Sequence, residues 1–366
     1  MRRRRAALHS MDKKRIVLTG GGTAGHATPH LALIPRLRQM GYEIHYIGTA
    51  DGIERQVIAS QPDVAYHSIS SGKLRRYFDW KNFTDPFRVI AGFFQAVKTL
   101  GKIKPAVCFS KGGFVAVPVV MAAWLRGIPV IAHESDLTPG LANRISAVFA
   151  KKVATTFPEC AVALGKKGVL TGTPLRPELF SGDRSRGLQL AGFAGNKPVL
   201  LMMGGSQGAQ SVNKALREAL PGVVPVMDVF HLCGKGNLEP SMQEVKGYYQ
   251  TEFLSEELPD ALACADLVLS RAGANALCEF QALRKPMLLV PLPRSSSRGD
   301  QILNAQSYEK RGLARVLLQE NLTSESLIAA LLQLIENAPT LREALAAAPA
   351  ADGTDAILQL IADYQR

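Results

Sequence analysis

Two glycine-rich segments, each placed directly after a run of apolar residues, are the parts of this sequence best suited to bind phosphate. The first, Gly20-Gly-Gly-Thr-Ala-Gly25, follows the run at 15–19 and fits the pattern G-x-G-x-x-G. The second, Gly204-Gly-Ser-Gln-Gly208, follows the run at 198–203, and Met202 stands where the first glycine of that pattern would be. Glycine allows a tight turn and a close approach to phosphate, and the helix N-terminus that follows offers aligned N–H groups. Two such loops predict two phosphorylated ligands.

Other interpretations remain open for both loops. A dinucleotide site would need an acidic side chain that binds a ribose hydroxyl, and Asp51, which follows the second apolar run of the chain, could supply it. A tight turn that binds no ligand is the alternative at each loop. His26, directly after the first loop, and the presence of a second loop favour a phosphorylated substrate over a dinucleotide.

Three side chains near predicted strand ends are candidates for proton transfer or for binding hydroxyl groups. His26 is expected in the first turn of the helix after the first loop, where the positive helix end keeps the ring neutral and able to accept a proton. Glu134 ends a later strand, beside His133, and Glu279 is placed on a helix to accept from ribose hydroxyls. The alternatives are a histidine that orients a phosphate, an exposed polar turn and a solvated helix acid.

Apolar runs of strand length alternate with helical repeats along the chain, which predicts an α/β fold. The expected strands cover 15–19, 42–48, 106–110, 129–133, 198–203, 265–270 and 287–291, and the expected helices cover 28–40, 209–220, 327–335 and 357–364. Because the winding begins again at Pro198, the sequence predicts two doubly wound, Rossmann-like domains that face each other across a cleft. A stretch rich in Pro and Gly at 157–198 is the predicted linker.

The net charge of +12 is concentrated near the N-terminus. Residues 1–110 hold 18 Lys or Arg against 7 Asp or Glu, which predicts an anionic partner such as a phospholipid surface, a nucleic acid or a phosphorylated substrate. Between Gly72 and Lys104, seven aromatic residues alternate with eight Lys or Arg, a pattern typical of a surface that enters an anionic bilayer. Rings of an ordinary core and stacking on single-stranded nucleic acid are the alternatives.

The five cysteines lie at unrelated spacings without a C-x-x-C pair, which argues against a disulfide framework and a zinc site and favours a reducing cytoplasm. No stretch approaches the ~20 apolar residues of a membrane span. The basic start of the chain also lacks the apolar core of a signal peptide. We therefore expect a cytosolic protein.

Seven short motifs, in one order along the chain, resemble those of the MurG family of bacterial N-acetylglucosaminyltransferases. The motifs are Gly21-Gly-Thr-Ala-Gly-His26, Lys111-Gly-Gly-Phe114, His133-Glu134, Gly172-Thr-Pro-Leu-Arg176, Gly204-Gly-Ser-Gln-Gly208, Ser270-Arg-Ala-Gly273 with Glu279, and Asp300-Gln301 with Asn304. The resemblance runs from about residue 13 to the C-terminus. It implies the GT-B fold, an inverting transfer that uses no metal or other cofactor, and peripheral attachment to the cytoplasmic face of the cell membrane.

The resemblance also implies the reaction, a transfer of GlcNAc from UDP-GlcNAc to the C4 hydroxyl of MurNAc in undecaprenyl-diphosphate-MurNAc-pentapeptide. His26 is the first candidate for the base and Glu134 the second. The residues that it implies for UDP-GlcNAc are Thr23, Ala24, Gly25, Arg176, Ser206, Leu254, Ala274, Glu279 and Gln301. Those implied for the acceptor diphosphate are Gly21, Gly22, Gly112 and Gly113.

By the same resemblance the chain divides into four segments. Residues 1–12 are a disordered basic extension, 13–177 the acceptor and membrane-binding domain, 178–350 the UDP-sugar domain and 351–366 a helix that packs back on the first domain. The expected partners are both substrates, an anionic inner-membrane lipid surface and other cell-wall synthesis proteins, with no nucleic acid. A related lipid glycosyltransferase, such as one that acts on diacylglycerol, and a UDP-GlcNAc 2-epimerase are the alternatives.

Three residues depart from the family pattern: Phe114 where some members carry Tyr, Asp136 in place of Asn, and Ala24 in place of Gly. A hydroxyl at position 114 is therefore not expected to be essential. Asp136 lacks an amide donor, so it is left out of the predicted sugar contacts.

Overall fold

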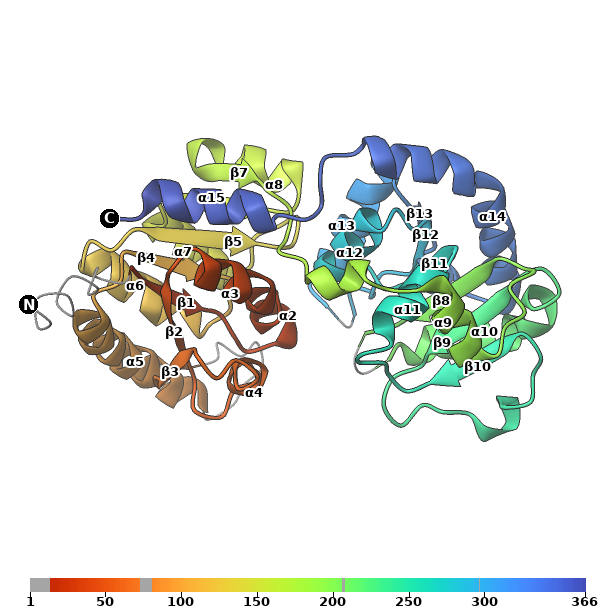
Figure 1. Ribbon diagram of the computed structural model, residues 1–366, viewed down its shortest axis with the longest axis horizontal. Helices are drawn as coiled ribbons and strands as arrows, with labels where there is room; N and C mark the ends of the chain where they lie inside the picture. Colours follow the sequence, from red (N-terminus) through yellow and green to blue (C-terminus); the bar gives the residue numbers. More distant parts are fainter. Residues whose placement is uncertain (1–13, 73–80, 206–207, 296) are drawn as a thin grey trace, which may run out of the picture. The chain divides into compact units, whose positions relative to one another are not determined.

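The chain folds as two compact units, each built on its own parallel sheet (Figure 1). The computed structural model describes residues 14–72, 81–205, 208–295 and 297–366. The first unit comprises the described residues up to Ser135 together with Pro139–Arg176 and Asp352–Arg366, and the second comprises Asp136–Thr138 and Pro177–Ala351. The basic extension predicted for residues 1–12 lies outside the described residues.

The first unit contains a seven-stranded sheet in the order β3-β2-β1-β4-β5-β6-β7, and every pairing is parallel. The strands are β1 (Arg15–Thr19), β2 (Glu43–Gly48), β3 (Ala65–Ser68), β4 (Val107–Ser110), β5 (Val130–Glu134), β6 (Lys152–Thr155) and β7 (Gly168–Leu170). The strand order reverses direction between β1 and β4. In sheets of this kind, ligands bind outside the carboxyl ends of the strands at that point.

Helices cover both faces of this sheet (Figure 1). Helices α3 (Pro29–Gln39) and α15 (Thr354–Tyr364) share one hydrophobic core with β1, and α5 (Lys81–Ile103), α6 (Ala116–Leu125) and α7 (Leu141–Phe149) share the other. The shorter helices are α2 (Ala24–Ala27), α4 (Ile53–Ile58), α8 (Pro158–Ala163) and the 3-10 helix η1 (Gly165–Lys167). Because Ile357 and Ile361 of α15 are fully buried, the C-terminal helix is part of the first unit's core.

The second unit repeats this plan with six parallel strands in the order β10-β9-β8-β11-β12-β13. The strands are β8 (Val199–Met203), β9 (Asp228–Leu232), β10 (Tyr248–Thr251), β11 (Leu267–Ser270), β12 (Met287–Leu289) and β13 (Arg315–Val316). The helices are η2 (Pro177–Phe180), α9 (Arg184–Ala191), α10 (Gln210–Val223), η3 (Pro240–Met242), α11 (Leu258–Cys264), α12 (Ala274–Ala282), α13 (Asp300–Lys310), η4 (Gln319–Asn321) and α14 (Ser324–Ala347). Helices α10 and α14 share one core with β8 and β11.

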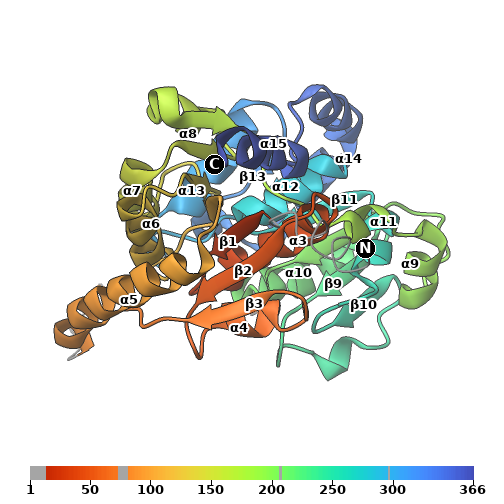
Figure 2. The ribbon, with the colours of Figure 1, turned by 60° about the vertical axis from the view of Figure 1, so that its left-hand side comes forward.

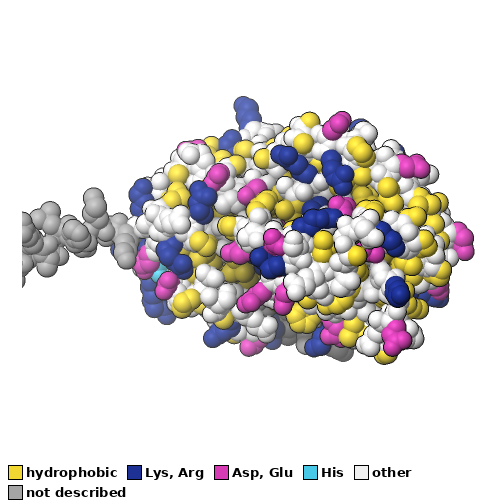
Figure 3. Space-filling model, turned by 45° about the vertical axis from the view of Figure 1, so that its right-hand side comes forward, with side chains coloured by type: hydrophobic (Ala, Val, Ile, Leu, Met, Phe, Trp, Pro, Cys, Tyr) yellow, Lys and Arg dark blue, Asp and Glu magenta, His cyan; other side chains and the backbone are white. Residues whose placement is uncertain are grey.

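Helix α5 has an apolar outward side. Phe87, Ile90 and Phe94 are 74, 54 and 65% exposed, and their spacing places them on one face of the helix. Figure 2 shows the N-terminal turns of α5 extending beyond the sheet. On the face of the molecule in Figure 3, by comparison, basic and acidic side chains are interspersed. No helix in the part of the chain that the structure describes is long and apolar enough to cross a membrane.

The seven predicted strands and four predicted helices are confirmed, and apart from α14 their boundaries shift by a few residues. Helix α14 continues well past the end of the predicted 327–335. Its C-terminal part contains Pro339, which usually ends a helix, whereas here packing in the core maintains the helix. The predicted linker at 157–198 contains the point where the chain passes from the first unit to the second, after Arg176, but most of this stretch is folded into α8, α9 and the strand β7, which joins the first sheet. These elements are short and expose most of their residues, so their hydrophobic pattern is weak.

Candidate active site

The first glycine loop lies against the turn that follows β4. Gly21 N–H donates to the carbonyl of Gly112 (3.2 Å), and Gly22 N–H donates to the carboxylate of Glu54 (3.2 Å). Gly22, Gly112 and Gly113 adopt positive φ, and a side chain on Gly113 would overlap the carbonyl of Gly21. The four glycines predicted for the acceptor diphosphate are therefore brought together, and the amides of Gly21 and Gly22 already have acceptors.

His26 lies on the short helix α2, directly after this loop. Its Nδ1 is 2.8 Å from the hydroxyl oxygen of Thr23, and the ring is partly buried. Burial and then the charge of Lys111 lower the pKa of His26 to about 4, and Glu54 acts in the opposite direction. The ring is therefore neutral at pH 7, but for a different reason than predicted. Helix α2 has only four residues, so burial and a lysine, rather than a helix end, account for the low pKa.

Glu134, the other candidate base, ends β5 and is 4% exposed. One carboxylate oxygen accepts from the Asn143 side chain (2.8 Å) and from the N–H of Gly140 (3.3 Å), the residue that precedes α7. The carboxylate therefore holds the start of α7. Asn143 also fills the space beneath Gly112, where a side chain would overlap it, so these residues fix the floor beside the first loop.

Two charged residues that sequence reasoning gave no role lie under the first loop. Lys111 is 1% exposed, and its ammonium group donates to His133 Nδ1 (2.8 Å) and to the hydroxyl of Ser135. Glu54 is fully buried and accepts from the N–H and hydroxyl of Thr49 (2.9 and 2.6 Å) as well as from Gly22. A lysine in a turn of small residues between two apolar segments is unusual, so the sequence could have indicated a role for Lys111. Glu54 could not have been recognised in this way, because its position is typical of an exposed acid on a helix.

The other residues predicted in the first unit lie at or near the same sheet edge. Gly25 and the backbone of Ala24 are part of α2, and Arg176 is partly buried and ends the segment Pro139–Arg176, after which the chain enters the second unit. Asp51, the acid of the dinucleotide interpretation, is exposed in the loop after β2, whereas the buried acid beside the glycines is Glu54.

In the second unit, the second glycine loop connects β8 to α10. Gly205 and Gly208 adopt positive φ, and a side chain on Gly208 would overlap the carbonyl of Cys233. Ser206, predicted at the donor diphosphate, lies outside the described residues. Helix α10 has 14 residues, and no side chain in the described part of the chain caps its N-terminus. The N–H groups of its first turn lie next to the loop, and helix N-termini in such a position commonly bind anions.

Arg271 lies beside the second loop. It belongs to the motif Ser270-Arg-Ala-Gly273, but the sequence predicted no role for it. Its guanidinium donates to the carbonyl of Val290 (2.9 Å) and to the hydroxyl of Ser211 (3.1 Å) in the first turn of α10. Burial lowers the pKa of Arg271. This side chain therefore connects the ends of β11 and β12 to α10.

The remaining residues predicted for the donor also lie in the second unit, after the carboxyl ends of its strands. Ala274 begins α12 and is buried, Glu279 lies on the same helix and is partly buried, and Leu254 follows β10. Gln301, on α13, accepts from the N–H of Leu292 (3.0 Å) after β12. The structure thus places these four residues around one edge of the second sheet.

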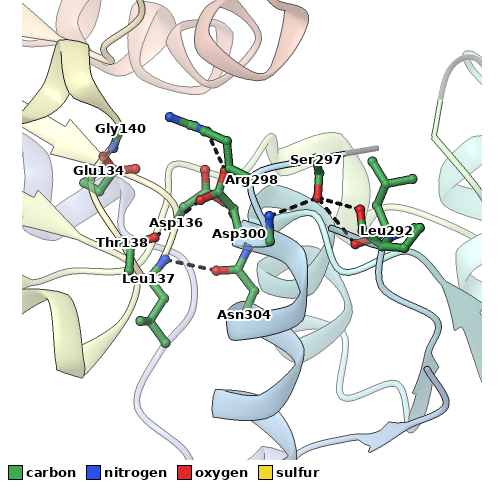
Figure 4. Close-up of polar contacts among 12 residues, drawn as sticks. Glu134, Asp136, Leu137, Thr138, Gly140, Leu292, Ser297, Arg298, Asp300 and Asn304 are labelled. Atoms are coloured by element: carbon green, nitrogen blue, oxygen red, sulfur yellow. Dashed lines mark hydrogen bonds and ion pairs between the residues drawn. The ribbon is translucent and has the colours of Figure 1, made fainter. Parts of the chain in front are cut away.

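Asn304 holds the three-residue segment Asp136–Thr138, which the contacts assign to the second unit (Figure 4). Its side-chain oxygen accepts from the N–H of Leu137 (3.0 Å), and its nitrogen donates to Asp136 (3.0 Å) and to the carbonyl of Ala272 (3.2 Å). Thr138 also contacts Asp300 (3.4 Å). Asp136, which has no amide to donate, therefore serves as an acceptor for Asn304.

The described residues contain no group of three or more His, Cys, Asp or Glu that could hold a metal ion. All five cysteines are buried and free.

Each half of the chain matches the model of a known family of domains. Residues 16–155 match the N-terminal domain of glycosyltransferase family 28, and residues 199–360 match its C-terminal domain. The chain is 54% identical, over 96% of its length, to the whole of the Clostridium kluyveri UDP-N-acetylglucosamine–N-acetylmuramyl-(pentapeptide) pyrophosphoryl-undecaprenol N-acetylglucosamine transferase. It is 52% identical, over 97% of its length, to 99% of the transferase of that name from Geobacillus kaustophilus.

The fold agrees with a solved structure of the same kind. The crystal structure of Acinetobacter baumannii MurG superposes with a TM-score of 0.74 and 26% identity, covering 96% of this chain and 99% of that one. Two Rossmann-like units of this topology constitute the GT-B fold. Since relatives this similar match over nearly their whole lengths, and both family domains follow in order, the chain belongs to glycosyltransferase family 28, among the MurG transferases.

Proposed function

We propose that this protein transfers GlcNAc from UDP-GlcNAc to the C4 hydroxyl of MurNAc in undecaprenyl-diphosphate-MurNAc-pentapeptide, the lipid I to lipid II step of peptidoglycan synthesis. The observation that carries this proposal is the similarity, over 96 to 97% of the chain, to transferases named for this donor and acceptor. The product supplies cell-wall synthesis, and through it cell shape and division. Other cell-wall synthesis proteins are therefore expected partners.

His26 is the base in this proposal. Its Nδ1 lies 2.8 Å from the hydroxyl oxygen of Thr23. In the tautomer that this proposal requires, Nδ1–H donates to that oxygen, and Nε2 has no proton and can accept one. Nε2 takes the proton of the C4 hydroxyl as that oxygen bonds to the anomeric carbon, and the bond from this carbon to the UDP oxygen breaks. The electron pair leaves with UDP, so the α linkage of the donor becomes a β-1,4 linkage. Glu134 is the less suitable base because its carboxylate already binds Asn143 and Gly140.

The second unit binds the donor. Negative charge grows on the departing diphosphate, and the N-terminus of α10, the amides of the second loop and Ser206 stabilise it. Glu279 accepts from ribose hydroxyls, Leu254 contacts the uracil through its backbone, and Gln301 binds the sugar. Ala274 provides room beside the nucleotide at the start of α12.

The first unit binds the acceptor and contributes Thr23, Ala24, Gly25 and Arg176 toward the donor. The glycines at 21, 22, 112 and 113 serve the acceptor diphosphate by holding two turns closely together without side chains. Backbone dipoles and Arg176 then replace a metal ion as the source of positive potential. Full activity after chelation with EDTA is the expected result, and its loss with recovery by one added metal would contradict this part of the proposal.

Helix α5 places the enzyme on the cytoplasmic face of the cell membrane as a peripheral protein. Phe87, Ile90 and Phe94 are exposed on one side of the helix, and Arg88 and Lys98 on the same helix are exposed as well. Apolar rings beside basic side chains suit a surface of anionic lipid. The aromatic residues Tyr77, Phe78 and Trp80 of the predicted surface lie outside the described residues.

A transfer assay with the purified chain tests the function. Radiolabelled UDP-GlcNAc is incubated with lipid-linked MurNAc-pentapeptide in detergent, and label is expected in the lipid product with one UDP released for each GlcNAc transferred. Diacylglycerol replaces the acceptor in one control, and the acceptor is omitted in the other. Transfer only to diacylglycerol would favour the related lipid transferase, and formation of ManNAc without acceptor would favour the epimerase.

A further inference from the structure

Lys111 is a buried cation directly under the first glycine loop. It follows β4, its N–H donates to the carbonyl of Thr19 (2.9 Å), and its side chain is 1% exposed. A Cβ atom on Gly20 would lie 3.1 Å from the Lys111 Cβ, so the loop rests on the lysine. Lysine is almost never fully buried, because its ammonium group loses favourable hydration. A lysine retained at this place therefore requires a reason beyond packing.

The ammonium group determines which nitrogen of His133 carries the proton. A lysine ammonium can only donate, so His133 Nδ1, 2.8 Å from Nζ, must be the acceptor. The proton of the neutral ring then lies on Nε2, which donates to the carbonyl of Gly172 (2.8 Å). Burial and the charge of Lys111 both lower the pKa of His133 well below its ordinary value, which keeps the ring neutral, and the two hydrogen bonds then select this tautomer.

The hydrogen bond from His133 also fixes the start of the segment that ends at Arg176. Gly172 adopts positive φ and begins Gly172-Thr-Pro-Leu-Arg176, the last segment before the chain enters the second unit. Thr173 bridges to Asp352, where the chain returns to the first unit. Lys111 therefore holds, through His133, the segment that carries Arg176.

Lys111 also acts on His26 through its charge. The ionisable groups that face His26 are Glu54 from α4, His30 from α3, Lys111 after β4 and His133 from β5. Burial, followed by Lys111 and His26, lowers the pKa of His30 to about 3, so both neighbouring rings are neutral. The charged groups that act on His26 are Lys111, which lowers its pKa, and Glu54, which raises it.

We propose that Lys111 is a positioning residue of the transfer site, an ammonium group beneath the first glycine loop that acts through His133 and His26 without touching either substrate. Its effect on catalysis rests on the proposed function, but its effects on the two histidines do not. A lysine with a purely structural role would tolerate replacement by an apolar side chain of similar volume with a cost in stability but without loss of kcat. A positioning lysine would not.

The test compares Lys111→Met, which keeps the volume and removes the charge, with Lys111→Arg, which keeps the charge. Lys151→Met is the matched control, since Lys151 is exposed and lies immediately before β6, at the amino ends of the strands. We expect Lys111→Met to unfold at a somewhat lower temperature than the wild type, because the buried Nδ1 of His133 loses its donor. We expect its kcat to fall about 10²-fold with an unchanged KM for UDP-GlcNAc, as for other losses of alignment in an active site. Lys111→Arg should retain more of the kcat.

Nitrogen NMR of the histidine rings gives a readout that needs no transferase activity. In the wild-type protein, His133 should show a protonated Nε2 and an unprotonated Nδ1. A protonated Nδ1 would overturn the proposal even if no variant folds. In Lys111→Met the titration midpoint of His26 should move to higher pH, and in Glu54→Gln it should move to lower pH. An unchanged His26 midpoint together with wild-type kcat in a folded Lys111→Met protein would also overturn it.

Discussion

The two glycine-rich loops start from similar sequences and lie in different surroundings. In the first unit, the N–H groups of Gly21 and Gly22 donate to Gly112 and Glu54. In the second unit, the loop leads to α10, a helix of 14 residues that no described side chain caps. A glycine pattern therefore does not by itself make an anion site, because its amides must remain available to a ligand.

The two loops differ in the charges beneath them as well. The first loop rests on a buried lysine and a buried glutamate, and it carries a neutral histidine at its end. The second is supported by Arg271, which is bonded to backbone carbonyls and to Ser211. We infer that the first loop is a rigid platform for proton transfer beside the acceptor diphosphate, and that the second loop binds the diphosphate of the donor.

The largest expected effect comes from removing the proton acceptor of the first loop. His26→Ala should lower kcat by about 10²–10⁴, as expected for loss of a general base, with little change in the KM for UDP-GlcNAc. Steady-state kinetics at saturating lipid-linked acceptor measures this. Glu134→Gln is the matched comparison, and it should cost less kcat because Asn143 and Gly140 already hold that carboxylate. A larger loss for Glu134→Gln would exchange the two roles.

The next effect concerns stability in acid. All five described histidines of the first unit have lowered pKa values: His26, His30, His45, His67 and His133. The second unit has His231, whose pKa burial lowers to about 3. The unfolded chain protonates these rings near pH 6.5, before the folded chain does, so stability is present above that pH and is lost as the pH falls toward 4.

A histidine with a folded pKa of about 4 should therefore cost on the order of 2 kcal/mol of stability between pH 7 and pH 5. Hydrogen exchange measured by mass spectrometry at both pH values, corrected for intrinsic rates, should show a greater loss of protection in β1 and β4 than in β8 and β11. His30→Leu removes one of these groups and should reduce the loss in the first unit. Equal losses in the two sheets would contradict the comparison.

The fold could be predicted from the sequence where apolar runs are long and bounded by glycine. Strands β1 and β8 are five residues each, follow polar residues and end at their loops, so their boundaries were accurate to one residue. Strands β7 and β13 have three and two residues and were missed, because so short a segment cannot show a repeating pattern of apolar and polar residues. Their places depend on pairing with neighbours far away in the sequence.

The site could be predicted only in part, for a related reason. His26 and the glycines stand next to one another in the sequence, so their association is local. Glu54 reaches Gly22 from 32 residues away, and Lys111 contacts His133 across two strands of the sheet. Such contacts depend on the order of the strands in the sheet and on which side chains face inward. A short sequence motif contains neither kind of information.

A smaller effect should follow from the hydroxyl group of the first loop. Thr23→Val removes the hydroxyl that lies 2.8 Å from His26 Nδ1 and keeps the shape of the side chain. We expect kcat to fall about tenfold, which corresponds to the loss of one hydrogen bond of ~1.4 kcal/mol to His26. Thr23→Ser keeps the hydroxyl and should keep most of the kcat. A rise in the KM for UDP-GlcNAc with an unchanged kcat would limit Thr23 to donor binding.

The smallest effect should come from the hydroxyl of the second loop, and its kinetic form distinguishes the two loops. Ser206→Ala should raise the KM for UDP-GlcNAc about fivefold, the loss expected from one hydrogen bond of ~1 kcal/mol to the diphosphate. The KM for the lipid acceptor should not change, because the proposed acceptor site lies in the first unit. UDP affinity measured by calorimetry should fall by a similar factor. If Ser206→Ala lowered only kcat and Thr23→Val raised only the donor KM, the loops would have exchanged functions, and the first would be the main site of the donor diphosphate despite its engaged amides.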